Sequence, residues 1–71
     1  DFIGGLATIN TGKVTDRFGE AIIRGRDNVP LIVQVRCDKP NNLSKNAEVL
    51  LVSLDRARNA FVVEPLKRSS G

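Results

Sequence analysis

AEVLLVSLDRARNAFVVEPL (Ala47 to Leu66) is the stretch that decides the fold of this chain. Two short apolar runs, 48–54 and 60–64, flank a polar turn at 55–59 and stop at a proline. Such runs are typical of a β-hairpin, and a proline cannot continue the hydrogen-bond ladder of a central strand. The stretch therefore predicts the last hairpin of a small β-domain, and its residue types carry no catalytic chemistry.

Three further strands are expected upstream of this hairpin. Residues 4–15 predict a long first strand with Gly12 inside it at a bulge or sharp bend, and 16–19 supply turn residues before a short strand at 20–24. A polar turn at 25–30 then leads into a run of strict alternation, the clearest period-two pattern in the chain. Its residues are predicted to face alternately the core (Leu31, Val33, Val35, Cys37) and the opposite side (Ile32, Gln34, Arg36).

The connection at 38–46 contains Pro40 and three asparagines, so it is too rich in turn residues for a full helix. We expect Leu43 to plug one end of a barrel from a single helical turn. Cys37 falls on the apolar side of its strand, and we expect a small buried hydrophobe there rather than a reactive thiol.

Five strands with short turns in a chain of 71 residues indicate an all-β fold, a small five-stranded OB-fold-like barrel. A sandwich usually needs about seven strands, and an open sheet would leave one apolar face bare. We expect one domain over 1–66 with a small, dense core, and a flexible C-terminal tail at 67–71.

The composition is that of a soluble domain, and the sequence contains neither a membrane span nor a recognisable signal peptide. Apolar residues make up 41% of the chain and charged residues 27%, as in soluble globular domains. No apolar run approaches the roughly 18 residues of a membrane span, and no signal peptide is recognisable. Because the chain begins at Asp1, we expect it to be a piece of a longer protein whose other segments lie outside it.

Catalytic chemistry is sparse. The chain has no histidine, its eight acidic residues lie mostly in turns or at strand ends, and Cys37 is its single cysteine. A serine or cysteine nucleophile would lack a histidine base, and a zinc ion would lack soft ligands. We therefore expect no enzyme activity and assign no catalytic, cofactor-binding or metal-binding residue.

The net charge of +3 permits contact with nucleic acid without demanding it. The cations are scattered over turns, at Arg24 and Arg26, at Arg56 and Arg58, and at 67–68. Bases bound on an OB-fold need aromatic side chains for stacking, yet Phe61 is expected in the core. Phe18 lies in a turn, where it either caps the barrel end, which we favour, or marks a contact surface.

The order of strands and turns over 4–66 resembles the soluble domain of NfeD-like membrane proteins. The most specific part is Val-Glu-Pro-Leu after a hairpin, residues 63–66 here. The family usually has glycine before the fourth strand and in the final turn, where this chain has Asn46 and Asn59. Asparagine tolerates the left-handed backbone conformation, so both are reasonable replacements, and the departures indicate a branch near the YqiJ-like inner-membrane proteins.

The resemblance implies an OB-fold on the cytoplasmic side of the inner membrane, anchored by transmembrane helices outside this chain. It implies protein partners, of the flotillin or band-7 type or a second copy, and no small-molecule substrate. It supplies no catalytic residues. Two alternatives stay open: a free-standing OB-fold that binds nucleic acid, and the accessory domain of a membrane protease whose catalytic residues lie elsewhere.

Overall fold

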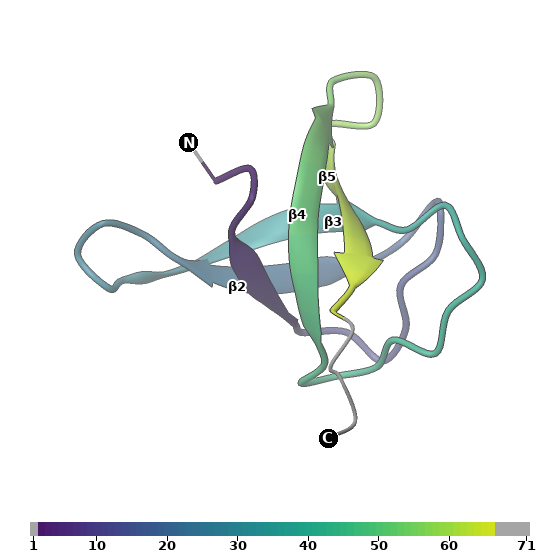
Figure 1. The fold of residues 1–71 in the computed structure, drawn as a ribbon, viewed down its shortest axis with the longest axis horizontal. Coiled ribbons are helices and arrows are strands. Elements are labelled where there is room, and N and C mark those ends of the chain that lie inside the picture. The colour runs from purple at the N-terminus through teal and green to yellow at the C-terminus, as the bar shows by residue number, and fades with distance from the viewer. Residues whose placement is uncertain (1, 67–71) are drawn as a thin grey trace.

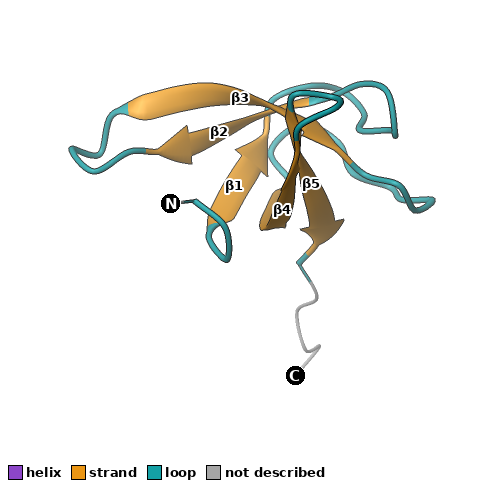
Figure 2. Cartoon of the chain, turned by 90° about the horizontal axis from the view of Figure 1, so that it is seen from above, coloured by secondary structure: helices purple, strands orange, loops and turns teal. Residues whose placement is uncertain are grey.

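The computed structural model of the chain describes residues 2–66, which form five strands and no helix (Figures 1 and 2). The strands are β1 (Leu6–Ile9), β2 (Glu20–Arg24), β3 (Pro30–Arg36), β4 (Glu48–Asp55) and β5 (Ala60–Pro65). No helix within these residues is long and apolar enough to cross a membrane. The expected tail at 67–71 lies outside the described residues.

The strands close into a barrel in the order β1-β2-β3-β5-β4, with β4 returning to β1. Neighbours are antiparallel except β3 and β5, which run parallel and pair only through Val35 with Phe61 and Arg36 with Val62. This short parallel contact closes the barrel. The prediction of an all-β fold with a small five-stranded, OB-fold-like barrel is confirmed.

The hairpin predicted from 47–66 is present as β4 and β5. The pairing runs from Val49 with Pro65 to Asp55 with Ala60, and a bulge at Val52 interrupts it. Asp55 shapes the turn, because its Oδ1 accepts hydrogen bonds from the backbone N–H groups of Ala57 (3.0 Å) and Arg58 (3.2 Å). A side chain that satisfies the backbone of its own turn in this way favours the turn over a longer strand.

The barrel interior is filled by branched aliphatic side chains, as the composition predicts. Its largest fully buried side chains come from four strands: Ile9, Val35, Val49, Leu51 and Val63. Val33 and Phe61 are partly buried and pack against this cluster, and Cys37 is buried beside it. The predicted inward direction of Val35, Cys37 and Phe61 is therefore confirmed, whereas Leu31, predicted to face the core, is 41% exposed.

Two of the expected elements differ. The first strand ends at Ile9 rather than reaching 15, because the chain leaves the sheet after the N–H of Asn10 bonds the carbonyl of Glu20 (2.8 Å). Gly12 then lies at a bend outside any strand. Val14, beyond the bend, turns back into the core and is 3% exposed, so it anchors the loop at 10–19.

Leu43 is buried as expected, but no helical turn carries it. Asn41 holds the segment instead. Its Oδ1 accepts a hydrogen bond from the N–H of Leu43 (2.9 Å), and its Nδ2 donates to the carbonyls of Val14 and Lys39 (3.0 Å each). A bridging asparagine therefore takes the place of the predicted helical turn.

Candidate interaction surface

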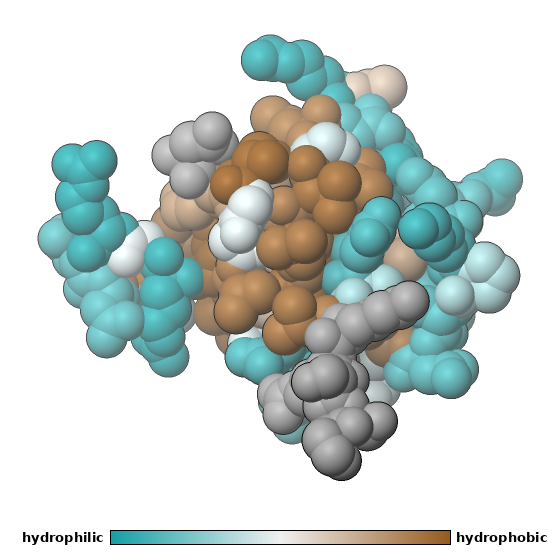
Figure 3. All heavy atoms as spheres, in the orientation of Figure 1, coloured by the Kyte–Doolittle hydropathy of each residue, from teal (hydrophilic) through white to brown (hydrophobic). Residues whose placement is uncertain are grey.

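The outer side of β1 and β4 carries an apolar face, defined here as Leu6, Leu50 and Val52. Leu6 pairs with Leu50 across the two strands, so both side chains leave the same side of the sheet. Leu6 is 52% exposed and Val52 38% exposed. Figure 3 shows a continuous apolar area at the centre of the view, where β1 and β4 lie nearest the viewer in Figure 1.

The chain before β1 extends this surface. The N–H of Gly4 bonds the carbonyl of Leu51 (2.8 Å), and the N–H of Leu51 bonds the carbonyl of Gly5 (2.9 Å), so the segment is fastened to β4. Phe2 and Ile3 in this segment are 38% and 41% exposed. The Phe2 ring meets the ring of Phe61 edge to face, with centroids 6.4 Å apart, which holds the segment at the barrel mouth.

Alternation along β4 places Val52 on the same side as Leu50, and a bulge directly after Leu51 interrupts that alternation. One extra residue on β4 lies between the pairs Leu51 with Val63 and Ser53 with Val62. Bulges alter the direction of side chains, and here Val52 and Ser53 are both exposed while Leu51 is buried. The face ends at polar positions on neighbouring strands, where Thr8 pairs with Glu48 and Glu64 with Leu50. An apolar centre with a polar border is typical of a protein-binding surface.

Several arginines of the described residues are held by hydrogen bonds to nearby backbone or side-chain oxygens. Arg24 donates to the carbonyl of Asn28 in its own turn (3.2 Å). Arg36 donates to the carbonyls of Val35 (2.6 Å) and Gly19 (3.0 Å), so its guanidinium braces the start of β2. Phe18 is 47% exposed and lies outside the buried core cluster, so its placement does not favour the barrel-end cap.

Arg58 forms a clasp, defined here as Arg58 with Asp38, Asp55 and the carbonyl of Asp16. Its Nη1 lies 2.7 Å from Asp38 Oδ1 and 2.9 Å from the carbonyl of Asp16, and its Nε lies 2.7 Å from Asp55 Oδ2. These bonds join the loop at 10–19, the connection at 38–46 and the β4–β5 turn. Hydrogen bonds from Arg58 lower the pKa of both Asp38 and Asp55. The clasp thus uses one of the cations that sequence reasoning left free for nucleic acid.

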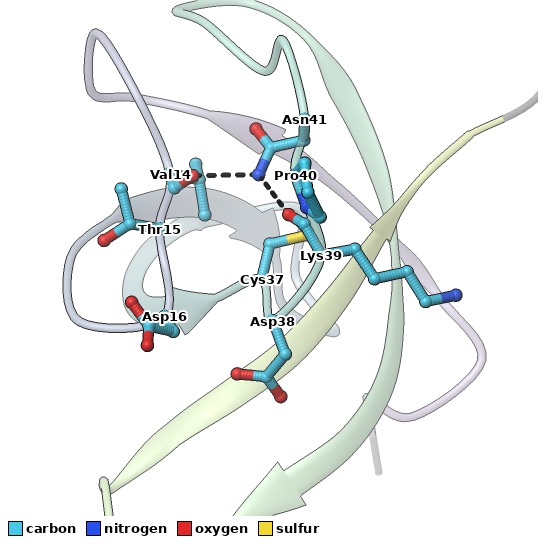
Figure 4. Close-up of a pocket in the computed structure, with 8 residues that line it drawn as sticks. All are labelled: Val14, Thr15, Asp16, Cys37, Asp38, Lys39, Pro40 and Asn41. Carbon is cyan, nitrogen blue, oxygen red and sulfur yellow. Dashed lines mark hydrogen bonds between the residues drawn. The ribbon is translucent and has the colours of Figure 1, made fainter.

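An open cavity of about 430 Å³ lies beside this clasp, between 14–16 and 37–41 (Figure 4). Cys37 lines it, and the thiol donates to the carbonyl of Lys39 (3.6 Å) while only 2% of the residue is exposed. Figure 4 shows the Lys39 side chain extending away from the cavity. The thiol is buried and its hydrogen bond goes to a backbone carbonyl, so this placement agrees with a buried, unreactive cysteine.

The described part of the chain brings together no group of three or more histidine, cysteine, aspartate or glutamate residues suited to a metal ion. Comparison with protein-family models, with curated proteins and with solved structures gives no match. Fold and surface together define the class of protein: a small OB-fold-like β-barrel with an exposed apolar face.

Proposed function

We propose that this domain is a non-catalytic protein-interaction barrel, the part of an NfeD-like membrane protein that lies outside the membrane on the cytoplasmic side. Its partner is a scaffold protein of the flotillin or band-7 type, and the contact surface is the apolar face. Membrane attachment is supplied by segments outside this chain.

One observation carries the proposal of protein binding: Leu6 and Val52 are exposed side by side with the half-buried Leu50 on paired strands. Exposed apolar side chains scattered singly are ordinary, but a continuous area with a polar border costs solubility unless a partner covers it. The face carries no cation, which disfavours an anionic ligand at this place.

The family assignment is supported by details of the last hairpin. Val63, Glu64 and Pro65 end β5 and Leu66 follows it, as in the family pattern. Asn46 and Asn59 have φ angles of 78° and 54°, in the left-handed region that glycine adopts most readily. These asparagines stand where the family usually has glycine, so the departures from the pattern preserve its backbone.

Binding of the chain to a purified band-7 domain of a flotillin-type protein, measured by calorimetry, tests the proposal. Val52→Asp puts a charge at the centre of the apolar face and should weaken binding at least about tenfold, because burial of an unpaired charge is costly. Val29→Asp is the matched control: Val29 is 52% exposed in the β2–β3 turn, away from the face, and its variant should bind like the wild type.

The nucleic-acid alternative is tested with a single-stranded oligonucleotide of about 20 nucleotides at low salt. The proposal predicts no binding tighter than about 100 μM. Micromolar affinity that falls steeply with rising salt would instead assign the domain to the OB-folds that bind nucleic acid. Failure of the band-7 domain to bind, with the oligonucleotide also inert, contradicts the proposed partner.

A further inference from the structure

The first half of β3 has one unpaired edge. Residues 30–34 pair with β2, but β5 meets β3 only at Val35 and Arg36. Figures 1 and 2 show the turn at 25–29 and the adjoining strand ends standing clear of the other strands. Among the described residues, no strand therefore covers the side of 30–34 that faces away from β2.

The strand alternation identifies the backbone groups on this edge. The N–H of Val35 points to β2, since it bonds the carbonyl of Gly19 (3.0 Å), and the carbonyl of Val29 points the same way, to the N–H of Gly25 (2.9 Å). Successive residues of a strand direct these groups to opposite sides, so those of the even-numbered residues face the open edge. They are the carbonyl of Pro30, the N–H and carbonyl of Ile32, and the N–H of Gln34.

Two features limit this edge at its ends. Pro30 has no N–H. An N–H at this position would point to the open side, and a strand tolerates proline where the N–H side is unpaired. At the other end, the parallel pairing of Val35 with Phe61 uses the carbonyl of Gln34. The open edge therefore presents two donors and two acceptors over five residues.

We propose that this edge binds the same edge of a second copy, by antiparallel β3–β3 pairing about a twofold axis at Ile32. In this register Ile32 faces Ile32 of the other copy and exchanges two hydrogen bonds with it. Pro30 of each copy faces Gln34 of the other, and its carbonyl accepts the N–H of that Gln34. In a regular ladder the N–H of residue 30 would bond the carbonyl of Gln34 in the other copy. Pro30 has no N–H, and the carbonyl of Gln34 already bonds β5, so neither group is left without a partner. All four open groups of the edge are therefore satisfied.

The side chains favour the same occupant. Ile32 is 63% exposed and Leu31 is 41% exposed, high values for large apolar residues in a strand. Pairing brings the two Ile32 side chains together and places Leu31 opposite Val33 of the other copy. Antiparallel apolar neighbours of this kind stabilise a sheet. The pairing also covers an exposed strand edge, which otherwise invites uncontrolled association.

The proposed β3–β3 pairing is limited to residues 30–34 in both copies. Beyond Gln34 the edge is occupied by β5, and before Pro30 each chain turns back toward its own β2 through the bond between Gly25 and Val29. An unrelated extended peptide would carry an N–H opposite Gln34, and this N–H would find no free carbonyl there. The arrangement is isologous, as a closed dimer requires.

Sedimentation and amide hydrogen exchange of the 71-residue chain, from about 10 μM to about 1 mM, test the proposal, because a short edge contact forms a weak dimer. The N–H groups of Ile32 and Gln34 should exchange fast at low concentration and become protected as the dimer forms. The N–H of Val35 should be protected throughout, since its bond lies within one copy.

Ile32→Lys should weaken the dimer at least about tenfold, because two like charges then meet at the twofold axis. Leu6→Lys, on the apolar face, is the control and should leave the dimer intact. A chain that stays monomeric up to about 1 mM overturns the proposal, as does a dimer in which Ile32 and Gln34 remain unprotected. If Ile32→Lys fails to fold, the proposal is tested by the hydrogen exchange of the wild-type amides without the variant. The result is independent of the band-7 partner.

Discussion

Gly19 lies where the loop at 10–19 enters β2, and its backbone has a φ of 148°. A Cβ there would come within 3.0 Å of both the Val14 side chain and the carbonyl oxygen of Val35. Gly19→Ala should therefore lower the free energy of unfolding by about 2 kcal/mol, through backbone strain and a clash with backbone that cannot move away. Urea denaturation measures the change.

Gly12→Ala is the matched control. A Cβ at Gly12 meets nothing within 4 Å, and its φ lies outside the left-handed region. The variant should keep the wild-type stability or gain a few tenths of a kcal/mol from a less flexible unfolded chain. Equal losses at the two glycines would show that the close approach at Gly19 is not formed.

Val35 and Val52 allow the same substitution to be compared inside and outside the barrel. Val35 is fully buried and Val52 is 38% exposed. Val35→Asp should abolish folding, since a buried carboxylate without a partner costs several kcal/mol, whereas Val52→Asp should fold with a loss below about 1 kcal/mol. Thermal unfolding followed by circular dichroism distinguishes the two. Similar stability of both variants would contradict the burial of the Val35 side chain in the barrel.

At the scale of elements, the Arg58 clasp joins three connections that are far apart in the sequence. Its ion pairs are partly exposed, with side-chain exposures of 28% for Arg58 and 53% for Asp38. Solvent therefore screens each pair, and the contribution of the clasp comes from several bonds to one guanidinium acting together.

The clasp makes stability depend on pH in a defined direction. Because Arg58 lowers the pKa of Asp38 and Asp55 in the folded chain, its stabilisation is complete above their ordinary pKa of 3.8 and is lost as the pH falls below it. The wild type should lose stability as the pH falls from about 4 to about 2. In Arg58→Gln this loss should be smaller, as measured by denaturation at each pH. An unchanged pH profile would exclude the clasp as its source.

The sequence predicts the strands and turns correctly where the local pattern of residues is enough to determine them. Alternation identified Val35 and Cys37 as buried, and the resemblance to the NfeD-like pattern identified Asn59 as a substitute for glycine. Leu31 has the same alternation but is exposed, because β3 extends beyond the strands that would cover it. The clasp was not predictable, since Arg58, Asp38 and Asp16 meet only after the barrel closes, and no local pattern marks such a meeting.

For the whole molecule, the parallel contact of β3 with β5 has two consequences. It closes the barrel with only two residue pairs, and its shortness leaves the first half of β3 open. The apolar face lies elsewhere, on β1 and β4. The domain thus exposes two separate surfaces, the apolar face of side chains on β1 and β4 and the open edge of backbone groups on β3.

The central claim is that the apolar face on β1 and β4 is the binding surface, and the most direct measurement is a titration followed by backbone amide shifts. The ¹⁵N-labelled chain is titrated with the band-7 domain at a concentration where the chain is monomeric. We predict shift changes concentrated at Leu6, Leu50 and Val52, with β2 and the turn at 25–29 unchanged. Changes centred on β2 and β3, or produced instead by a single-stranded oligonucleotide, would contradict the account.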